Sequence, residues 1–78
     1  MYVLHTGDLV RLRQPAPALW LPRGEMGVVQ NSFVCPSVAY EVEFHPRGRI
    51  GTVTTLVSRE QVDALAPSGR VLSMRAMQ

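Results

Sequence analysis

Residues 38–45 alternate between apolar and mostly polar side chains, and this pattern constrains the fold more than any other feature of the sequence. One face carries four apolar residues: Val38, Tyr40, Val42 and Phe44. The other face carries Ala39, Glu41, Glu43 and His45. Because successive side chains of a β-strand point to opposite faces, the pattern predicts a strand with one buried face. A strand of this kind needs neighbours, so the chain should be a β protein.

Four further segments have the character of short strands. In residues 9–13 apolar side chains alternate with arginines, and residues 26–33 are mostly apolar. Residues 49–57 are rich in β-branched residues, which favour strands. The last such segment is residues 62–65. Turn residues at 46–48 predict that the third and fourth strands form a hairpin. Ser58 and Gln61 have the spacing of a capping box, which predicts one helical turn. Gly27 and Gly51 are expected at bends.

Five short antiparallel strands, with one helical turn before the last, predict a mainly β protein: a small five-stranded SH3-like barrel over residues 1–66. A sheet that wraps around its core leaves fewer unpaired edges. An OB-fold usually places a helix between its third and fourth strands, where this chain has only residues 45–48, so we discount it. Residues 67–78 are interpreted as an apolar tail and an interface arm, in which residues 71–77 give a second contact.

The length and composition of the chain limit the classes of function that it could have. A chain of 78 residues makes one domain with a thin core, so a homo-oligomer is plausible. The single Cys35 excludes an internal disulfide, no Cys/His spacing suggests a metal site, and no apolar run approaches the roughly 20 residues of a membrane span. A cytoplasmic location is therefore expected.

No residue pattern indicates catalysis, and we expect neither an enzyme nor a bound cofactor. His5 and His45 lack an evident positioning partner, and Cys35 is expected to be an ordinary loop residue. Ser58 fits a helical cap better than a nucleophile. Glu41 and Glu43 would share one solvated environment, which suits solvation or pairing with Arg47 or Arg49 rather than acid–base work.

The proline-rich segment of residues 14–24 is the first candidate binding surface. It contains Trp20, whose indole either folds back over the end of the barrel or stands out as an interface anchor. If Trp20 is exposed, this segment is the binding face. The predicted partner-binding residues are Leu19, Trp20, Leu21 and Arg23.

The arginines are the second candidate surface. The chain has eight arginines and no lysine, with a formal net charge of +2. Arg11 and Arg13 share one face of the first strand. Together with Arg47 and Arg49 they are the predicted nucleic-acid contacts, although Tyr40 and Phe44 on the core face leave few aromatic side chains for base stacking.

Several short segments resemble the small bacterial proteins grouped as domain of unknown function 4926. They are residues 7–10, 21–29, 39–44 and 54–57, leading to Leu65. The family has no catalytic residues to transfer, and its members are similar to small partner proteins that are sometimes encoded beside putative toxins. The resemblance implies an SH3-like barrel with a binding role, and an antitoxin-like role is one form of it.

The spacing of residues 7–11 and 24–29 also resembles the nitrile hydratase beta-subunit barrel and KOW modules. A further likeness is to the plasmid-borne dihydrofolate reductase, a tetramer of SH3-like chains. Residues 52–55 lack the Gln and Tyr of its Val-Gln-Ile-Tyr strand, so its cofactor contacts do not carry over. The sequence thus predicts a non-enzymatic protein-interaction module; nucleic-acid binding and a reductase-like oligomer are the alternatives.

Overall fold

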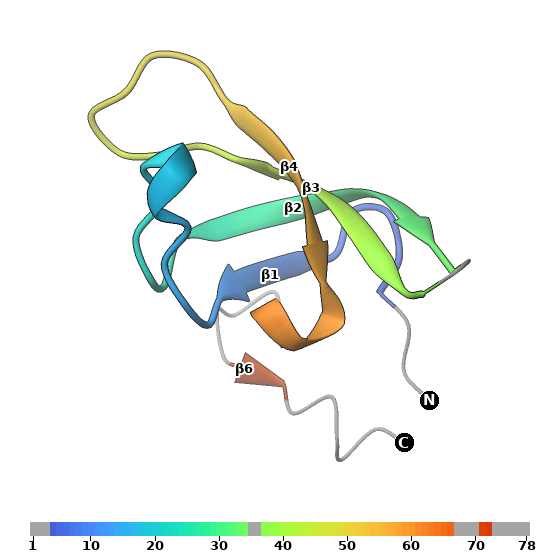
Figure 1. Cartoon of the computed structure of the whole chain (residues 1–78). Coiled ribbons are helices and arrows are strands. Elements are labelled where there is room, and N and C mark those ends of the chain that lie inside the picture. The colour runs from blue at the N-terminus through green and yellow to red at the C-terminus, as the bar shows by residue number, and fades with distance from the viewer. Residues whose placement is uncertain (1–3, 35–36, 67–70, 73–78) are drawn as a thin grey trace.

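The computed structural model describes residues 4–34 and 37–66, together with the backbone of residues 71–72. Its elements, in chain order, are β1 (Leu9–Leu12), η1 (Pro17–Leu19), β2 (Met26–Phe33), β3 (Ala39–Phe44), β4 (Val53–Ser58), η2 (Arg59–Gln61), β5 (Val62–Leu65) and β6 (Val71–Leu72) (Figure 1). Both η elements are single 3-10 turns of three residues. The protein is mainly β, as the sequence predicts. Among the described residues, no helix is long and apolar enough to cross a lipid bilayer.

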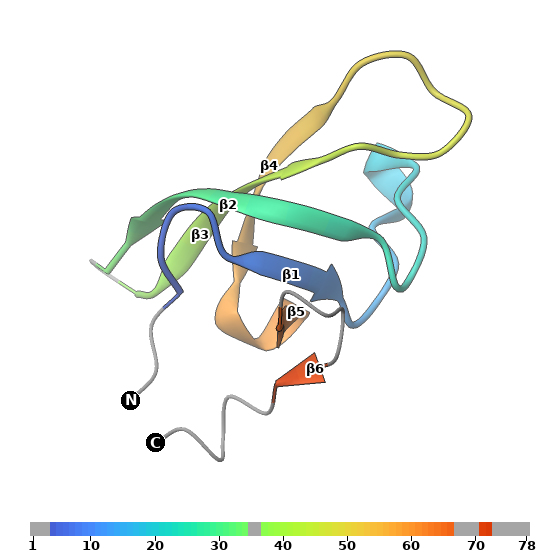
Figure 2. The same cartoon turned by 180° about the vertical axis from the view of Figure 1, so that it is seen from behind.

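All the strands belong to one antiparallel sheet, in the order β4-β3-β2-β1-β5-β6. The five predicted strands are present, and β6 adds a short sixth strand to the edge of β5. Figure 2 shows β5 and β6 on the opposite side of β1 from β2. In both views β4 crosses over β3 and β2, so the sheet folds back on itself. Among the described strands, no ladder joins β4 to β5 or β6.

The core forms where the sheet folds back. The alternation predicted for β3 is confirmed, since Tyr40, Val42 and Phe44 are fully buried while Glu41 and Glu43 are half-buried. The Tyr40 hydroxyl accepts a hydrogen bond of 3.3 Å from the backbone N–H of Leu4. The remaining buried hydrophobic residues are Leu4, Val10, Leu12, Leu21, Val29, Val57, Val62, Ala64 and Leu65. Every strand from β1 to β5 therefore contributes to one small core.

The connection between β3 and β4 is longer than the sequence analysis predicts. Phe44 pairs with Val53, so the strand expected to start at Arg49 starts four residues later. Gly48 and Gly51 adopt φ values of +73° and +90°, which non-glycine residues rarely adopt, and they turn the chain away from the ladder. Residues 45–52 therefore form a loop, hereafter the hairpin loop.

Gly27 allows two strands to approach closely. It lies buried in β2, opposite Phe44 in the register. A Cβ atom there would lie 2.6 Å from Val42 Cγ1 and 2.9 Å from the carbonyl oxygen of Glu43. The irregularity in the β2–β3 ladder lies further along, between Val29 and Asn31. Gly27 is thus required by packing, whereas the bend expected at Gly51 lies in the hairpin loop.

Gly27→Ala should destabilise the protein strongly. Overpacking of this kind costs about 1–3 kcal/mol, and we expect the upper part of that range because one of the clashing atoms is backbone. Gly51→Ala is the matched control: its Cβ would meet open space, leaving only backbone strain of about 1 kcal/mol. Urea unfolding of the two variants measures the difference. Equal losses would contradict the packing role of Gly27.

Candidate functional site

Residues 14–24, hereafter the proline loop, are held together by nested backbone hydrogen bonds. At the base, the N–H of Leu12 donates to Glu25 O and the N–H of Gly24 donates to Leu12 O, both at 2.9 Å. Further out, Ala16 and Leu21 exchange backbone hydrogen bonds of 2.8 and 3.2 Å. Prolines within the loop fix φ and restrict its freedom further. The proline loop therefore has one defined conformation and is not a flexible connection.

Trp20 stands at the tip of the proline loop with 82% of its surface exposed. Of the two interpretations given above, the structure shows the one in which the indole stands out. Trp20 follows η1 in the left-handed region, with φ 58°, and its N–H donates to Pro17 O at 3.1 Å. It is the one non-glycine residue with positive φ among the described residues. Such strain persists only where the surrounding structure enforces it.

Arg49, which lies in the hairpin loop, helps to hold the backbone of Trp20 in this conformation. Its Nη1 donates to the carbonyl oxygen of Leu19 at 2.9 Å and lies 3.5 Å from that of Trp20. These carbonyls end the η1 turn, where the intrahelical bonding pattern stops. The sequence analysis assigned Arg49 to a nucleic-acid surface, but in the structure its guanidinium binds the proline loop. Arg49 thereby joins the two loops.

The other predicted partner-binding residues lie in three different environments. Leu21 is only 2% exposed and belongs to the core, because its pairing with Ala16 turns the chain inward. Leu19 is half-buried and packs against the same core. Arg23 is exposed, and its side chain makes no hydrogen bond or ion pair with another described residue. The accessible part of this set is therefore Trp20 and Arg23, with Leu19 at its margin.

Arg11 lies in β1 and Arg13 directly follows the last residue of that strand, Leu12, and both side chains lie near one carboxylate. Arg11 Nη2 is 3.8 Å from Asp63 Oδ2, and Arg13 Nε is 3.6 Å from Asp63 Oδ1. Arg13 Nη1 also donates to the carbonyl oxygen of Glu60 at 3.3 Å. These distances are long for charge-assisted hydrogen bonds, so much of the donor capacity of both guanidiniums stays unused.

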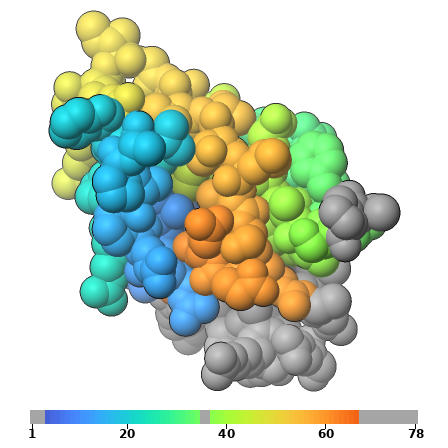
Figure 3. Space-filling model, viewed as in Figure 1, coloured from blue at the N-terminus to red at the C-terminus, as the bar shows by residue number. Residues whose placement is uncertain are grey.

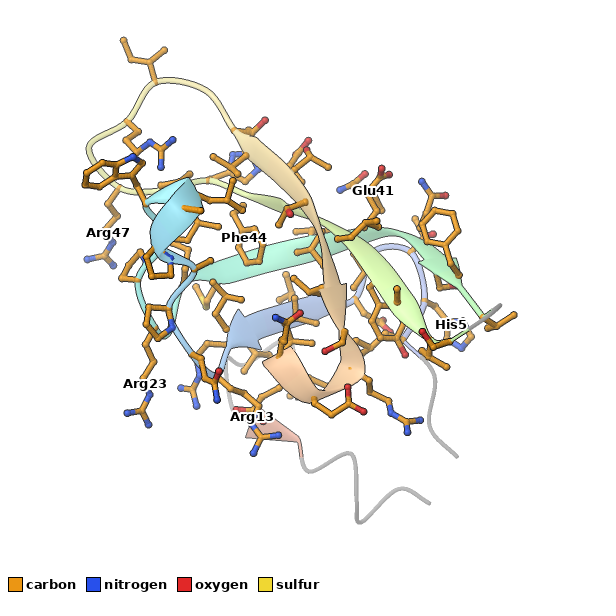
Figure 4. The ribbon with its side chains drawn as sticks, viewed as in Figure 1. His5, Arg13, Arg23, Glu41, Phe44 and Arg47 are labelled. Carbon is orange, nitrogen blue, oxygen red and sulfur yellow. The ribbon has the colours of Figure 1, made fainter. Side chains whose placement is uncertain are left out.

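Figure 4 shows the side chains of Arg47, Arg23 and Arg13 following one another along one side of the molecule. Arg11, Arg13 and Arg23 line one hollow of about 620 Å³, hereafter the arginine hollow. Its other lining residues are Leu12, Gln14, Glu60 and Asp63. Arg47 lies outside it, beside Arg23 in a separate small depression. The structure therefore gathers two of the four predicted nucleic-acid contacts, Arg11 and Arg13, with Arg23.

A second hollow, hereafter the loop–β4 groove, lies between the proline loop and β4 and has a volume of about 190 Å³. It is lined by Leu12, Gln14, Pro15, Ala16, Leu19, Leu21, Thr55, Leu56, Val57 and Gln61. In Figure 3 the blue and cyan atoms of the proline loop face the orange atoms of β4 and η2. This groove was not predicted from the sequence. The one available signal for it was the apolar Leu56 beside the threonines of β4.

The remaining polar side chains make local contacts. Glu41 accepts a 2.8 Å hydrogen bond from Asn31 Nδ2, and His45 Nε2 lies 3.2 Å from Glu43 Oε1. Among the described residues, neither glutamate pairs with Arg47 or Arg49. Cys35 and all but the backbone of residues 71–72 in the tail lie outside the described residues. Within the described ranges, no three His, Cys, Asp or Glu residues form a cluster that could hold a metal ion.

The carboxyl group of Glu60 should titrate below its ordinary pKa of 4.5. A hydrogen bond from its own backbone N–H lowers the pKa most, and one from the Ser58 side chain lowers it further. A lowered pKa means that the ionised form stabilises the η2 turn above pH 4.5, and that this contribution is lost as the pH falls through the folded-state pKa. NMR titration of the Glu60 carboxyl carbon checks this, and Ser58→Ala should raise the midpoint. A wild-type midpoint at or above 4.5 would contradict it.

Arg49→Gln should loosen the proline loop while leaving the sheet intact. The variant removes a charged donor from the carbonyls of Leu19 and Trp20, a contact worth on the order of 1 kcal/mol at an exposed site. We expect a lower NMR order parameter for the Trp20 indole N–H and faster exchange of the Leu19 and Trp20 amides. Arg47→Gln, a neighbour without such a contact, is the control. Identical loop dynamics in both variants would exclude the bracing role.

Trp20 on its braced loop and the two adjoining hollows are the features from which a function can be argued. No family model, curated protein or solved structure matches this chain.

Proposed function

We propose that this chain is a non-enzymatic protein-interaction module, a small SH3-like barrel that contacts its partner through the tip of the proline loop. The observation that carries the proposal is the 82% exposure of Trp20 on a loop held by its own hydrogen bonds and by Arg49. Tryptophan is enriched among the few residues that dominate binding energy at protein interfaces. A large exposed indole without such a role would be a liability.

The geometry of the proline loop favours tight binding through Trp20 alone. Association loses free energy when loops and side chains become ordered at the interface, and a preorganised loop avoids much of that loss. Three prolines, the Ala16–Leu21 bridge and the Arg49 contact all restrict the proline loop before any partner arrives. The strained φ of Trp20 fits the same interpretation, because it is maintained where function gains from it.

The neighbouring hairpin loop extends the apolar surface. Ile50, the residue after Arg49, is fully exposed, and the Arg49 contact places the two loops side by side. Figure 3 shows the cyan and yellow segments of these loops in contact at one corner of the molecule. Two exposed apolar residues on adjoining loops suit an interface with another protein, or with a second copy of this chain.

Nucleic-acid binding is the alternative proposal, and the arrangement of the arginines gives it less support. Arg11 and Arg13 share Asp63, and Arg49 holds the proline loop. Within the set proposed to bind nucleic acid, Arg47 alone makes no such contact with a described residue, and the Asp63 carboxylate reduces the net charge that Arg11 and Arg13 offer to a phosphate. Each neutralised phosphate contributes a slope of only about −0.9 to the dependence of log affinity on log salt, so binding through so few arginines would be weak.

Trp20→Ala should abolish most of the association. The partners tested are the chain itself, by sedimentation velocity over a range of concentrations, and the products of the adjacent genes, by calorimetry. An anchor of this kind contributes about 2 kcal/mol or more, roughly a thirtyfold change in the dissociation constant. Because Trp20 is the one tryptophan of the chain, its emission should also shift to the blue on binding.

Phe33→Ala is the matched control, since Phe33 is an exposed aromatic residue (46%) at the far end of β2. Association that is unchanged by Trp20→Ala, or that is lost equally in both variants, would overturn the proposal. Binding to a short DNA duplex that weakens steeply with salt would favour the alternative.

A further inference from the structure

We propose that the loop–β4 groove and the arginine hollow form one binding site, and that its ligand is an extended segment of a partner protein with an apolar side chain next to acidic ones. The inference rests on the proposed interaction role and names the chemistry of the partner. Trp20 lines neither hollow, so this site is separate from the loop tip.

Strand β4 has a free edge. This strand pairs with β3 on one side and ends the described sheet on the other. Its pairing with β3 runs from Ala39–Ser58 to Phe44–Val53 without a register shift, and it contains neither proline nor a charged residue. Natural proteins usually protect edge strands with such residues or with bulges. An unprotected edge is suited to accept one more strand from a peptide.

The loop–β4 groove lies against this edge. Thr55, Leu56 and Val57 all line it. Consecutive side chains of a strand point to opposite faces, so a groove lined by three consecutive residues runs along the side of the strand. An extended segment lying there would meet both the free backbone groups of β4 and the wall formed by the proline loop.

Apolar residues make up most of the lining of the loop–β4 groove. Leu12, Leu21 and Val57 are buried residues that form its lower part, Leu19 is half-buried, and Leu56 is 62% exposed at its rim. An apolar side chain from a ligand would cover Leu56 and complete the packing around Leu19. Peptides that add a strand to a sheet gain affinity from the backbone and specificity from pockets of this kind.

The arginine hollow carries a net positive charge. The arginine hollow contains three guanidinium groups, from Arg11, Arg13 and Arg23, and two carboxylates, from Glu60 and Asp63. Each guanidinium has five N–H donors in a planar fork suited to carboxylates. Contacts among the described residues use few of these donors and none on Arg23. An acidic ligand side chain would complement the net positive charge of the hollow.

The two hollows adjoin, because Leu12 and Gln14 line both of them. Neighbouring residues of an extended peptide are only about 3.3 Å apart along the chain. One short segment can therefore place an apolar side chain in the loop–β4 groove and acidic side chains in the arginine hollow. Nucleic acid fits this combination less well, because an apolar groove along a sheet edge offers nothing to a phosphate.

The test is a selection of random dodecapeptides displayed on phage against the whole purified chain. The selected peptides are then synthesised and their dissociation constants measured by fluorescence anisotropy. We expect the selected sequences to share an apolar or β-branched residue next to Asp or Glu. In NMR spectra, the amides of residues 54–57 should shift on binding. A single-stranded DNA oligonucleotide is titrated in parallel.

Two variants examine the two halves of the site. Arg23→Gln should raise the dissociation constant of the selected peptides roughly five- to tenfold, the range expected for a partly exposed charged hydrogen bond. Leu56→Thr, which places a residue with high β propensity at an exposed position of β4, should weaken binding by a similar factor. Arg47→Gln is the control for charge alone, since Arg47 lines neither hollow, and should change binding less than twofold.

The results separate this inference from the proposed function. Failure to select peptides, selection of basic or uncharged sequences, or equal effects of Arg23→Gln and Arg47→Gln would each overturn the acidic-peptide site. Preferential binding of the oligonucleotide would overturn it in favour of nucleic acid. If the site fails while association through Trp20 persists, the proposed function stands. If the peptides bind but Trp20→Ala leaves partner association unchanged, the role of the loop tip fails instead.

Discussion

The burial of one face of β3 is the interaction on which the rest of the structure depends. Tyr40, Val42 and Phe44 are the centre of a core that every strand from β1 to β5 completes. Their burial requires β2 to approach closely, and only a residue without a side chain at position 27 allows this. Because a chain of 78 residues has little apolar area to bury, no second cluster among the described residues could replace this one.

The small size of the core also explains how the proline loop is stabilised. From this loop the core takes the side chain of Leu21, while the indole of Trp20 stays exposed. The loop is instead stabilised by contacts that need no core: backbone bridges, prolines and the guanidinium of Arg49. Leu21 provides the anchor inside and Trp20 the exposed surface outside, one residue apart. The buried side chain of Leu21 thus anchors the loop to the core, and the adjacent side chain of Trp20 is exposed to solvent.

How much could be predicted from the sequence varied with the range of the interaction involved. The faces of β1 and β3 followed from alternation, because a two-residue period depends only on neighbours in the chain. The capping box was also local, and the Ser58 N–H does donate to Gln61 Oε1 at 2.7 Å. The start of β4 was predicted too early, because β-branched residues at 50 and 52 suggested a strand where two glycines with positive φ direct a loop.

The candidate site depended on longer-range contacts and was correspondingly harder to predict. Leu21 looked like surface because its neighbours do, but its bridge to Ala16 turns it inward. Arg49 was grouped with the other arginines, and only the fold shows that it reaches across 30 positions to Leu19. The loop–β4 groove combines residues from 12 to 61, a separation that no local pattern reports.

The described sheet ends in two different strands, β4 on one side and β6 on the other. If the β4 edge of one molecule met the β6 edge of the next, the contact would be heterologous, and such contacts build open fibres unless the rotation between copies closes a ring. A ligand seated along β4 would terminate growth of this kind. Occupancy of the groove would then protect the protein against polymerisation as well as serving recognition.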